Sequence, residues 1–310
     1  GSKMFTTNGH LTDYVFVLAR TNPDAPDHRA LTTLLVPNDQ PGSEAQAGFI
    51  VLQADKAHPM SGSNCICVVT ALLELGILPM EEPSTTVVLD TPAGLVTARA
   101  QCAGGRCVSV SLDMVPSFVE YLDVVIQTDE FGPIKADIAF GGVYYALIDV
   151  EQVGLSIEPG KARELADAGV RLRSVINQQL SVKHPLIDSL NEVAYVMFRN
   201  RIDQFTWQTC TTLPPGRVDR SPCGTGSSAN LATLSARGQV IPGDQLVSRS
   251  TIGGEFKVEL LGLTEVGDRA AVLPRITGRA WVYGMHQIGV DPDDPLADGF
   301  MLSDTWGEGF

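Results

Sequence analysis

Ser221-Pro222-Cys223-Gly224-Thr225-Gly226 is the stretch from which the fold of this chain can be predicted, and Pro59-Met60-Ser61-Gly62-Ser63-Asn64 is its counterpart in the first half. Each stretch has a nucleophilic side chain, then glycine, then serine or threonine, at the start of a helical pattern. The two helical patterns end at Gly76 and Gly238, equally far from Ser61 and Cys223. Two segments of equal spacing, one in each half, predict duplicated halves that face each other.

A pair of helix N-termini directed at one cleft forms a binding site for an anion. The free N–H groups and the positive end of each helix dipole bind a carboxylate, and they stabilise the enolate-like charge that forms when an α-proton leaves. A cysteine at such a terminus has a lowered pKa, so we expect Cys223 to act as a base. Asp219, four residues earlier, is placed to pair with a substrate ammonium.

Simpler structural roles exist for the same residues. Ser61 taken alone would be a helix N-cap, Cys223 taken alone would be a small buried residue, and Asp219 is able to cap a turn. The repeated spacing favours an active-site position for Ser61 and Cys223 instead.

Strand-like runs dominate the rest of the chain. Helical patterns cover residues 65–75, 161–177 and 227–237, and strand patterns include residues 14–19, 86–89, 144–148, 193–198 and 280–283. The prediction is a mixed α/β fold with much antiparallel sheet. A composition shift at residues 128–133 divides the chain into half-domains at 41–130 and 131–285, with a C-terminal segment at 286–310 that returns to the first half and an atypical segment at 1–40.

Composition narrows the class of partner. The chain of 310 residues has a formal net charge of −14, which disfavours binding to nucleic acid. Neither a membrane-spanning apolar run nor a signal-peptide pattern is found, so a cytoplasmic protein with reduced thiols is expected, as a monomer or homodimer. Cys65 and Cys67 lack the spacing of a zinc site, and no metal is expected. Cys102 and Cys107 flank a hairpin signal and are interpreted as small strand residues.

The run from Asp219 to Gly226 resembles the second catalytic motif of the proline racemase family at every position, and the resemblance extends over about residues 45–310 through residues 137–142 and 278–281. It implies a diaminopimelate epimerase-like fold, with two halves that each curl a sheet around a central helix, and it implies catalysis without a cofactor. In this family two cysteines exchange protons with opposite faces of a proline ring. The resemblance gives Cys223 one of these roles and gives Ser61 the place of the other cysteine.

The remaining site residues also follow from the resemblance. Gly62, Ser63, Gly224 and Thr225 would cradle the substrate carboxylate, and Asp219 would hold the ring amine. The family's first motif reads Met-Cys-Gly-His-Gly, so this chain departs from it at Ser61, Ser63 and Asn64.

Replacement of the first cysteine by Ser61 makes the site asymmetric, because a hydroxyl is a far weaker acid than a thiol. This asymmetry, and the family members that share it, favour dehydration of trans-3-hydroxy-L-proline to Δ1-pyrroline-2-carboxylate. The α-hydrogen and the 3-hydroxyl lie on one ring face, so one residue is able to remove the α-proton and to protonate the departing hydroxyl. Epimerisation of 4-hydroxyproline at C2 is the alternative. An inactive or amino-acid-binding protein with a hybrid N-terminus is the alternative of another class.

The N-terminal segment 1–40 has a different resemblance. Residues 5–9, 13–14 and 28–31 are similar to a middle-domain β segment of acyl-CoA dehydrogenases, over too little chain to build a flavin site.

Overall fold

The structure is a computed structural model that describes residues 32–37, 44–52, 57–58, 60–91, 94–214, 216–284, 291 and 293–295. Its helices are α1 (Gly62–Glu74), α2 (Ala162–Gln179) and α3 (Gly224–Ala236), with two short 3₁₀ turns, η1 (Val150–Val153) and η2 (Pro159–Lys161). Its strands are β1 (Thr32–Pro37), β2 (Ala47–Leu52), β3 (Ala57–His58), β4 (Ser84–Thr91), β5 (Gly94–Ala103), β6 (Arg106–Asp113), β7 (Ser117–Thr128), β8 (Gly132–Phe140), β9 (Tyr144–Asp149), β10 (Val193–Arg201), β11 (Thr206–Leu213), β12 (Arg217–Val218), β13 (Gln245–Ser250), β14 (Glu255–Val266) and β15 (Arg269–Gly278).

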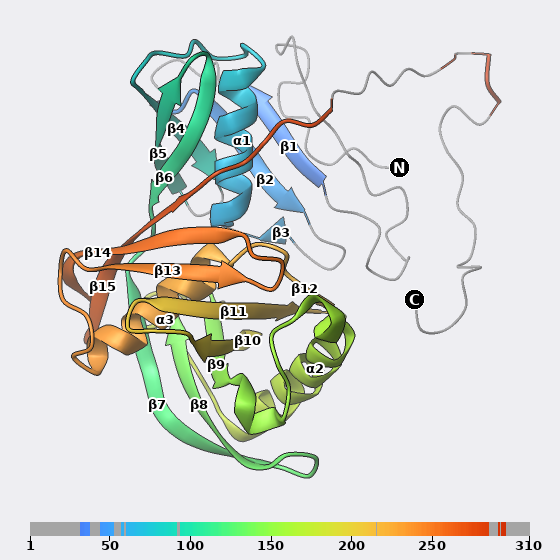
Figure 1. Cartoon of the computed structure of the whole chain (residues 1–310), viewed down its shortest axis with the longest axis vertical. Coiled ribbons are helices and arrows are strands. Elements are labelled where there is room, and N and C mark those ends of the chain that lie inside the picture. The colour runs from blue at the N-terminus through green and yellow to red at the C-terminus, as the bar shows by residue number, and fades with distance from the viewer. Residues whose placement is uncertain are drawn as a thin grey trace.

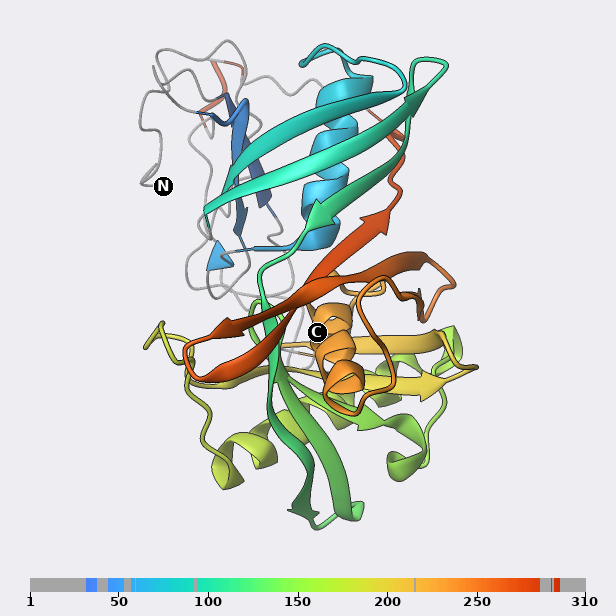
Figure 2. The same ribbon diagram turned by 90° about the vertical axis from the view of Figure 1, so that its left-hand side faces the viewer.

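Among the described residues the strands form one continuous mixed sheet in the order β1-β2-β4-β5-β6-β15-β14-β13-β11-β10-β9-β8-β7. Because β7 also pairs with β15, the strands of the second half close into a barrel-like ring. Helix α3 lies inside this ring, and the strands of the first half curl around α1 (Figures 1 and 2). The fold is therefore the expected mixed α/β architecture, in which each half wraps a sheet around a central helix.

The topology repeats between the two halves. Strand β2 pairs antiparallel with β3, the chain then forms α1, and β4 returns parallel to β2. Strand β11 likewise pairs antiparallel with β12, the chain forms α3, and β13 returns parallel to β11. Antiparallel pairs β4–β5 and β13–β14 follow in each case. The two equally spaced segments of the sequence are thus the crossover helices of two copies of one unit.

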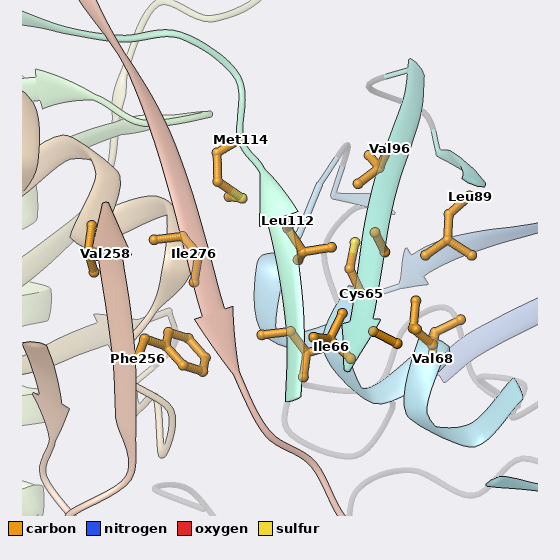
Figure 3. Packing of buried hydrophobic residues seen from close by; sticks show 14 of the residues in the cluster. Cys65, Ile66, Val68, Leu89, Val96, Leu112, Met114, Phe256, Val258 and Ile276 are labelled. Carbon is orange, nitrogen blue, oxygen red and sulfur yellow. The ribbon is translucent and has the colours of Figure 1, made fainter. Parts of the chain in front are cut away.

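The packing of α1 follows from its apolar stripe. Cys65, Ile66, Val69 and Leu72 recur at helical spacing and are buried, so the helix presents one apolar face to the curled sheet. Figure 3 shows this cluster, in which side chains of α1, β4, β5 and β6 pack together and extend toward Ile276 of β15. The first half is therefore joined to β15 through a shared core.

Helix α3 is instead rich in small residues and is buried on nearly every side. Gly226 shows why small residues are required, because a Cβ there would overlap the Met197 side chain. Outside the ring, α2 covers β10 and β11 and carries the apolar stripe expected for residues 161–177.

A buried ionic network fixes the C-terminal part of α3 to the sheet. Asp137 of β8 is 2% exposed and accepts hydrogen bonds from Arg199 at 2.7 Å and from Arg237 at 2.9 Å. Arg199 also donates to Asn230 of α3 at 3.0 Å. Burial by itself raises the pKa of Asp137, but the two guanidinium groups hold it below its ordinary value.

Most predicted strands lie inside observed ones. Residues 280–283 form no strand. Strands β7 and β15 were not predicted, and β15 contains Pro274, a residue that usually argues against an interior strand position. The sheet accommodates this proline opposite a register shift in β14, next to Leu260. The strand predicted at 14–19 lies outside the described residues.

Residues 128–133, where the sequence indicates a domain boundary, contain the turn of the β7–β8 hairpin. The boundary between the two buried hydrophobic clusters falls earlier in the chain than this turn, since Met114 belongs to the first cluster and Phe118 to the second. A division into half-domains at residue 130 stays a prediction, and these clusters favour a position nearer to residue 115. Cys102 and Cys107 face each other across the β5–β6 hairpin as buried free thiols.

Candidate active site

The N-termini of α1 and α3 meet at the junction of the two halves. A Cβ built on Gly62 would lie 3.7 Å from the Cα of Gly224, and one built on Gly224 would lie 3.6 Å from the Cα of Gly62. Ser61 and Cys223 are the N-cap residues that directly precede these two glycines. The fold therefore brings together the hydroxyl-bearing and thiol-bearing segments that are far apart in the sequence.

Both helix tips keep backbone donors that the helix does not use. The first intrahelical bond of α1 runs from Cys65 N–H to the Ser61 carbonyl at 3.0 Å, and that of α3 from Ser227 N–H to the Cys223 carbonyl at 2.8 Å. The amides of the three residues between belong to the first turn, where a helix has no internal acceptor. Neither N-cap side chain makes a capping hydrogen bond. Such a pair of termini is suited to an anion such as a carboxylate.

Ser61 is held by its neighbours and not by a capping bond. Asn64 Nδ2 donates to Ser61 Oγ at 2.8 Å, and the Ser63 hydroxyl lies 3.4 Å from the same atom. With Asn64 donating, the proton of the Ser61 hydroxyl stays available to a ligand. The N-cap role that the residue type suggests is not what the side chain does here.

Cys223 is buried and adopts a left-handed backbone conformation with φ of 63°, which is uncommon for a residue other than glycine. Its N–H donates to Ser221 Oγ at 3.1 Å. Its sulfur lies 3.3 Å from the Tyr145 hydroxyl and 3.8 Å from the Thr225 hydroxyl. An unfavourable backbone conformation at the junction of the halves is typical of a functional site.

The acidity of the Cys223 thiol differs from what the sequence led us to expect. Burial raises the pKa of Cys223, and the charge of Asp219 raises it further, although the Thr211 and Tyr145 hydroxyls lower it in part. A cysteine at a helix N-terminus was expected to have a lowered pKa. That expectation was wrong, because desolvation and a nearby carboxylate outweigh the helix terminus.

Asp219 is the first residue of the run from Asp219 to Gly226 and forms a turn with Ser221. Its Oδ1 accepts a hydrogen bond from Ser221 N–H at 2.8 Å, and its own N–H donates to the Thr211 carbonyl at 2.8 Å. Burial raises the pKa of the Asp219 carboxyl, and the bond from Ser221 opposes this. Asp219 thus forms the turn that the sequence allowed, and it also lies close enough to Cys223 to affect its thiol.

The run at residues 137–142 has a clear role in placing α3. A Cβ on Gly141 would overlap the carbonyl oxygen of Thr225, and Gly142, with φ of 123°, lies under the Thr225 side chain. Only glycine lets the β8–β9 turn approach the first turn of α3 this closely.

Three neighbours of the site were not anticipated. Tyr145 contacts Cys223, Asn64 holds Ser61, and the buried Thr211 hydroxyl lies near enough to lower the pKa of Cys223. Asn64 stands inside the quoted motif and could have been found there. Tyr145 and Thr211 lie on distant strands and carry no sequence signal.

His184 packs against Phe118 and Phe140 in the second core, and no group of three potential metal ligands occurs in the described ranges. None of the helices described in the structure has the length and apolar character needed to span a membrane.

The fold and the site together define a class: duplicated α/β halves whose central helices meet tip to tip, one with a thiol and one with a hydroxyl. The chain belongs to the proline racemase family, whose model matches residues 21–301. It is 59% identical over 265 residues to a 4-hydroxyproline 2-epimerase of Allorhizobium ampelinum, covering 86% of this chain and 76% of the relative. It is 54% identical over 274 residues to one of Agrobacterium fabrum, covering 88% and 79%.

A solved structure gives the same result. The hydroxyproline epimerase from Agrobacterium vitis, with bound trans-4-OH-L-proline, matches with a TM-score of 0.79 and 58% identity over 89% of this chain and 80% of that one. The family match corrects the interpretation of the N-terminal segment. Residues 21–40 lie within the proline racemase match, and the resemblance to acyl-CoA dehydrogenases finds no support.

Proposed function

We propose that this protein is a 4-hydroxyproline 2-epimerase that inverts C2 by cofactor-independent proton transfer. The observation that carries the proposal is the contact of Gly62 with Gly224, which brings the residues before them, Ser61 and Cys223, to one place. The two relatives named 4-hydroxyproline 2-epimerase support the same substrate. This was the alternative at the level of sequence, and it now has better support than dehydration.

The proposed roles follow from the chemistry of each group. The substrate carboxylate binds to the free amides at the tips of α1 and α3, where Gly62, Ser63, Gly224 and Thr225 lie. The ring ammonium pairs with Asp219 and offsets the negative charge that raises the pKa of Cys223, so that the thiol gives up its proton to solvent. The Cys223 thiolate then takes the α-proton, and the electron pair of the C–H bond enters the carboxylate as an enolate.

The second proton transfer uses the opposite ring face. The Ser61 hydroxyl, or a water molecule bound to it, gives a proton to C2, so that inversion is complete. The bond from Asn64 to Ser61 Oγ stabilises the oxygen as it loses its proton. Because oxygen is the weaker acid, this step is the slow one.

Dehydration of trans-3-hydroxy-L-proline remains a second candidate, and the presence of Ser61 in place of cysteine favours it. In that reaction Cys223 removes the α-proton and then protonates the departing 3-hydroxyl on the same face. Δ1-pyrroline-2-carboxylate and water are the products, and Ser61 only donates a hydrogen bond.

Turnover in heavy water separates these functions. The protein is incubated with trans-4-hydroxy-L-proline, trans-3-hydroxy-L-proline and L-proline in D₂O, and products are followed by NMR. We expect inversion of the 4-hydroxyproline with one deuterium at C2. Pyrroline formation from the 3-hydroxy isomer alone would replace the epimerase by the dehydratase. Lack of exchange with all three substrates would indicate a binding or inactive protein.

Two variants test the assigned groups. Cys223→Ala should abolish deuterium incorporation, because the group on the other ring face, the Ser61 hydroxyl, is too weak an acid to supply a base near neutral pH. Ser61→Cys should raise the epimerisation rate, because it places a second thiol opposite the first. Unchanged exchange in Cys223→Ala would refute the assignment of the base.

A further inference from the structure

Tyr145 of β9 connects the thiol of Cys223 to the first turn of α3. Its hydroxyl lies 3.3 Å from the Cys223 sulfur and 2.7 Å from the Thr225 hydroxyl. The side chain is 1% exposed, so this polar atom is satisfied inside the protein by these two groups. A phenol that bridges the thiol and a residue of the proposed carboxylate cradle occupies a position from which it affects both.

The fold holds the Tyr145 ring in one place. Its ring packs against Tyr195 with centroids 5.6 Å apart, and a Cβ on Gly226 would come within 3.1 Å of its Cε1. The missing side chain of Gly226 is therefore what lets α3 lie over the ring. This leaves the hydroxyl little freedom to turn away from the sulfur.

We propose that Tyr145 is a positioning residue that donates a hydrogen bond to the thiolate of Cys223. Through this bond, the protonation state of the Cys223 sulfur sets the orientation of the Thr225 hydroxyl. The inference deepens the proposed function and rests on Cys223 as the base. Burial raises the pKa of Tyr145 well above its ordinary value, so its hydroxyl stays a donor at the pH where the thiol ionises.

Two hydrogen-bond arrangements correspond to the two protonation states of Cys223, and they differ by the proton on sulfur and by the rotation of the two hydroxyl hydrogens. With a thiolate, Thr225 donates to the Tyr145 oxygen and Tyr145 donates to sulfur. With a thiol, the S–H donates to Tyr145, Tyr145 donates to Thr225, and the hydrogen of Thr225 turns to the substrate carboxylate. The carboxylate thus gains a donor when Cys223 has taken the α-proton, which is when negative charge appears on it.

Other groups near the thiol also affect the pKa of Cys223 or of Tyr145. Asp219 acts on Cys223 from the preceding turn, Thr211 from β11, and Tyr195 acts on Tyr145 from β10. None of these is changed by Tyr145→Phe, which retains the ring and removes only the hydroxyl.

The test measures the acidity of the thiol without substrate. The full chain is treated with iodoacetamide across a pH series, and labelling of Cys223 is followed by peptide mass spectrometry. In Tyr145→Phe we expect the apparent pKa of Cys223 to rise by about one unit, a roughly tenfold slower labelling below that pKa. Labelling of the exposed Cys67 in the same samples should not change.

Tyr144→Phe is the matched control. Tyr144 is the neighbouring tyrosine on β9, is equally buried, and places its hydroxyl 3.3 Å from Glu120 Oε2 instead of at the thiol. It should label as the unmodified protein does, and circular dichroism checks that both variants fold. An unchanged pKa of Cys223 in Tyr145→Phe would overturn the proposal.

Thr225→Val tests the transmission. A rise of the Cys223 pKa that is absent when Thr225→Val is made in the Tyr145→Phe protein supports it, because the Thr225 hydroxyl also lies 3.8 Å from the sulfur and only the pathway through the phenol is lost with Tyr145. An unchanged thiol pKa in Thr225→Val, or an equal rise in both proteins, would refute that link. Since labelling needs no substrate, these results stand apart from whether 4-hydroxyproline is turned over.

Discussion

The acidity of the Cys223 thiol depends strongly on its surroundings. Burial and the carboxylate of Asp219 both favour the protonated thiol. A substrate ammonium next to Asp219 would cancel one of these effects. The proposed base is thus activated by the molecule on which it acts.

Asp219→Asn tests this coupling at the residue scale. Burial still raises the pKa of Cys223 in the variant, but the neighbouring charge is gone, so the pKa should fall and thiol labelling at neutral pH should become faster. The KM for 4-hydroxyproline should rise by at least about tenfold, because the ammonium loses its partner. Labelling against pH and steady-state kinetics measure the two effects. Slower labelling in the variant would contradict the coupling.

Helix α3 shows how an element positions the site. Its N-terminus rests on the Gly141-Gly142 turn, its body is packed against Met197 through Gly226, and its C-terminal part is tied to Asp137 through Arg199 and Arg237. These contacts set the height and direction of the helix tip against α1. The direction in which the amides at the tip of α3 point therefore depends on all of these contacts.

Gly141→Ala tests this at the scale of the element. The added Cβ would overlap the Thr225 carbonyl, so the tip of α3 must move, and we expect a loss of about 1–3 kcal/mol in the free energy of unfolding and at least about tenfold in kcat/KM. Gly160→Ala is the control, because a Cβ there meets nothing within 4 Å and the backbone is ordinary; its stability should change by less than about 0.5 kcal/mol. Urea unfolding and turnover assays measure both variants. Equal behaviour of the two variants would contradict the proposed role of the turn.

At the scale of the whole molecule, the two halves are not independent bodies. The sheet is continuous through β6, β15 and β14, and the first core contains residues from both sides of this junction, including Leu112 and Ile276. Strand β15 also pairs with β7, where the second core begins. Shared strands and shared buried surface couple the unfolding of one half to that of the other.

Calorimetry tests this coupling together with the position of the site. We expect a single unfolding transition, and trans-4-hydroxy-L-proline at about 100 times its Kd should stabilise the protein by roughly 2.7 kcal/mol. Because the proposed ligand contacts both helix tips, the whole transition should move. Two transitions of which the ligand moves only one would show that a single half binds it.

The sequence alone predicted a large part of this protein. Helical periodicity and the terminal glycines marked α1 and α3, since Gly76 and Gly238 both adopt the left-handed conformation that ends a helix. The duplication, the mixed fold and the family were also readable, because each rests on short-range pattern or on a contiguous motif. The choice between epimerase and dehydratase was not, because Ser61 in the motif is compatible with both.

Only the tertiary structure decided the environment of the site. Tyr145 lies 78 positions from Cys223 in the sequence, and the overlap at Gly141 involves a helix that follows far along the chain. The pKa of Cys223 moves opposite to the local expectation, because desolvation and the field of Asp219 depend on which groups the folded chain brings close. Local spacing determines which residues begin a helix, whereas burial and through-space charge exist only once distant strands have packed around it.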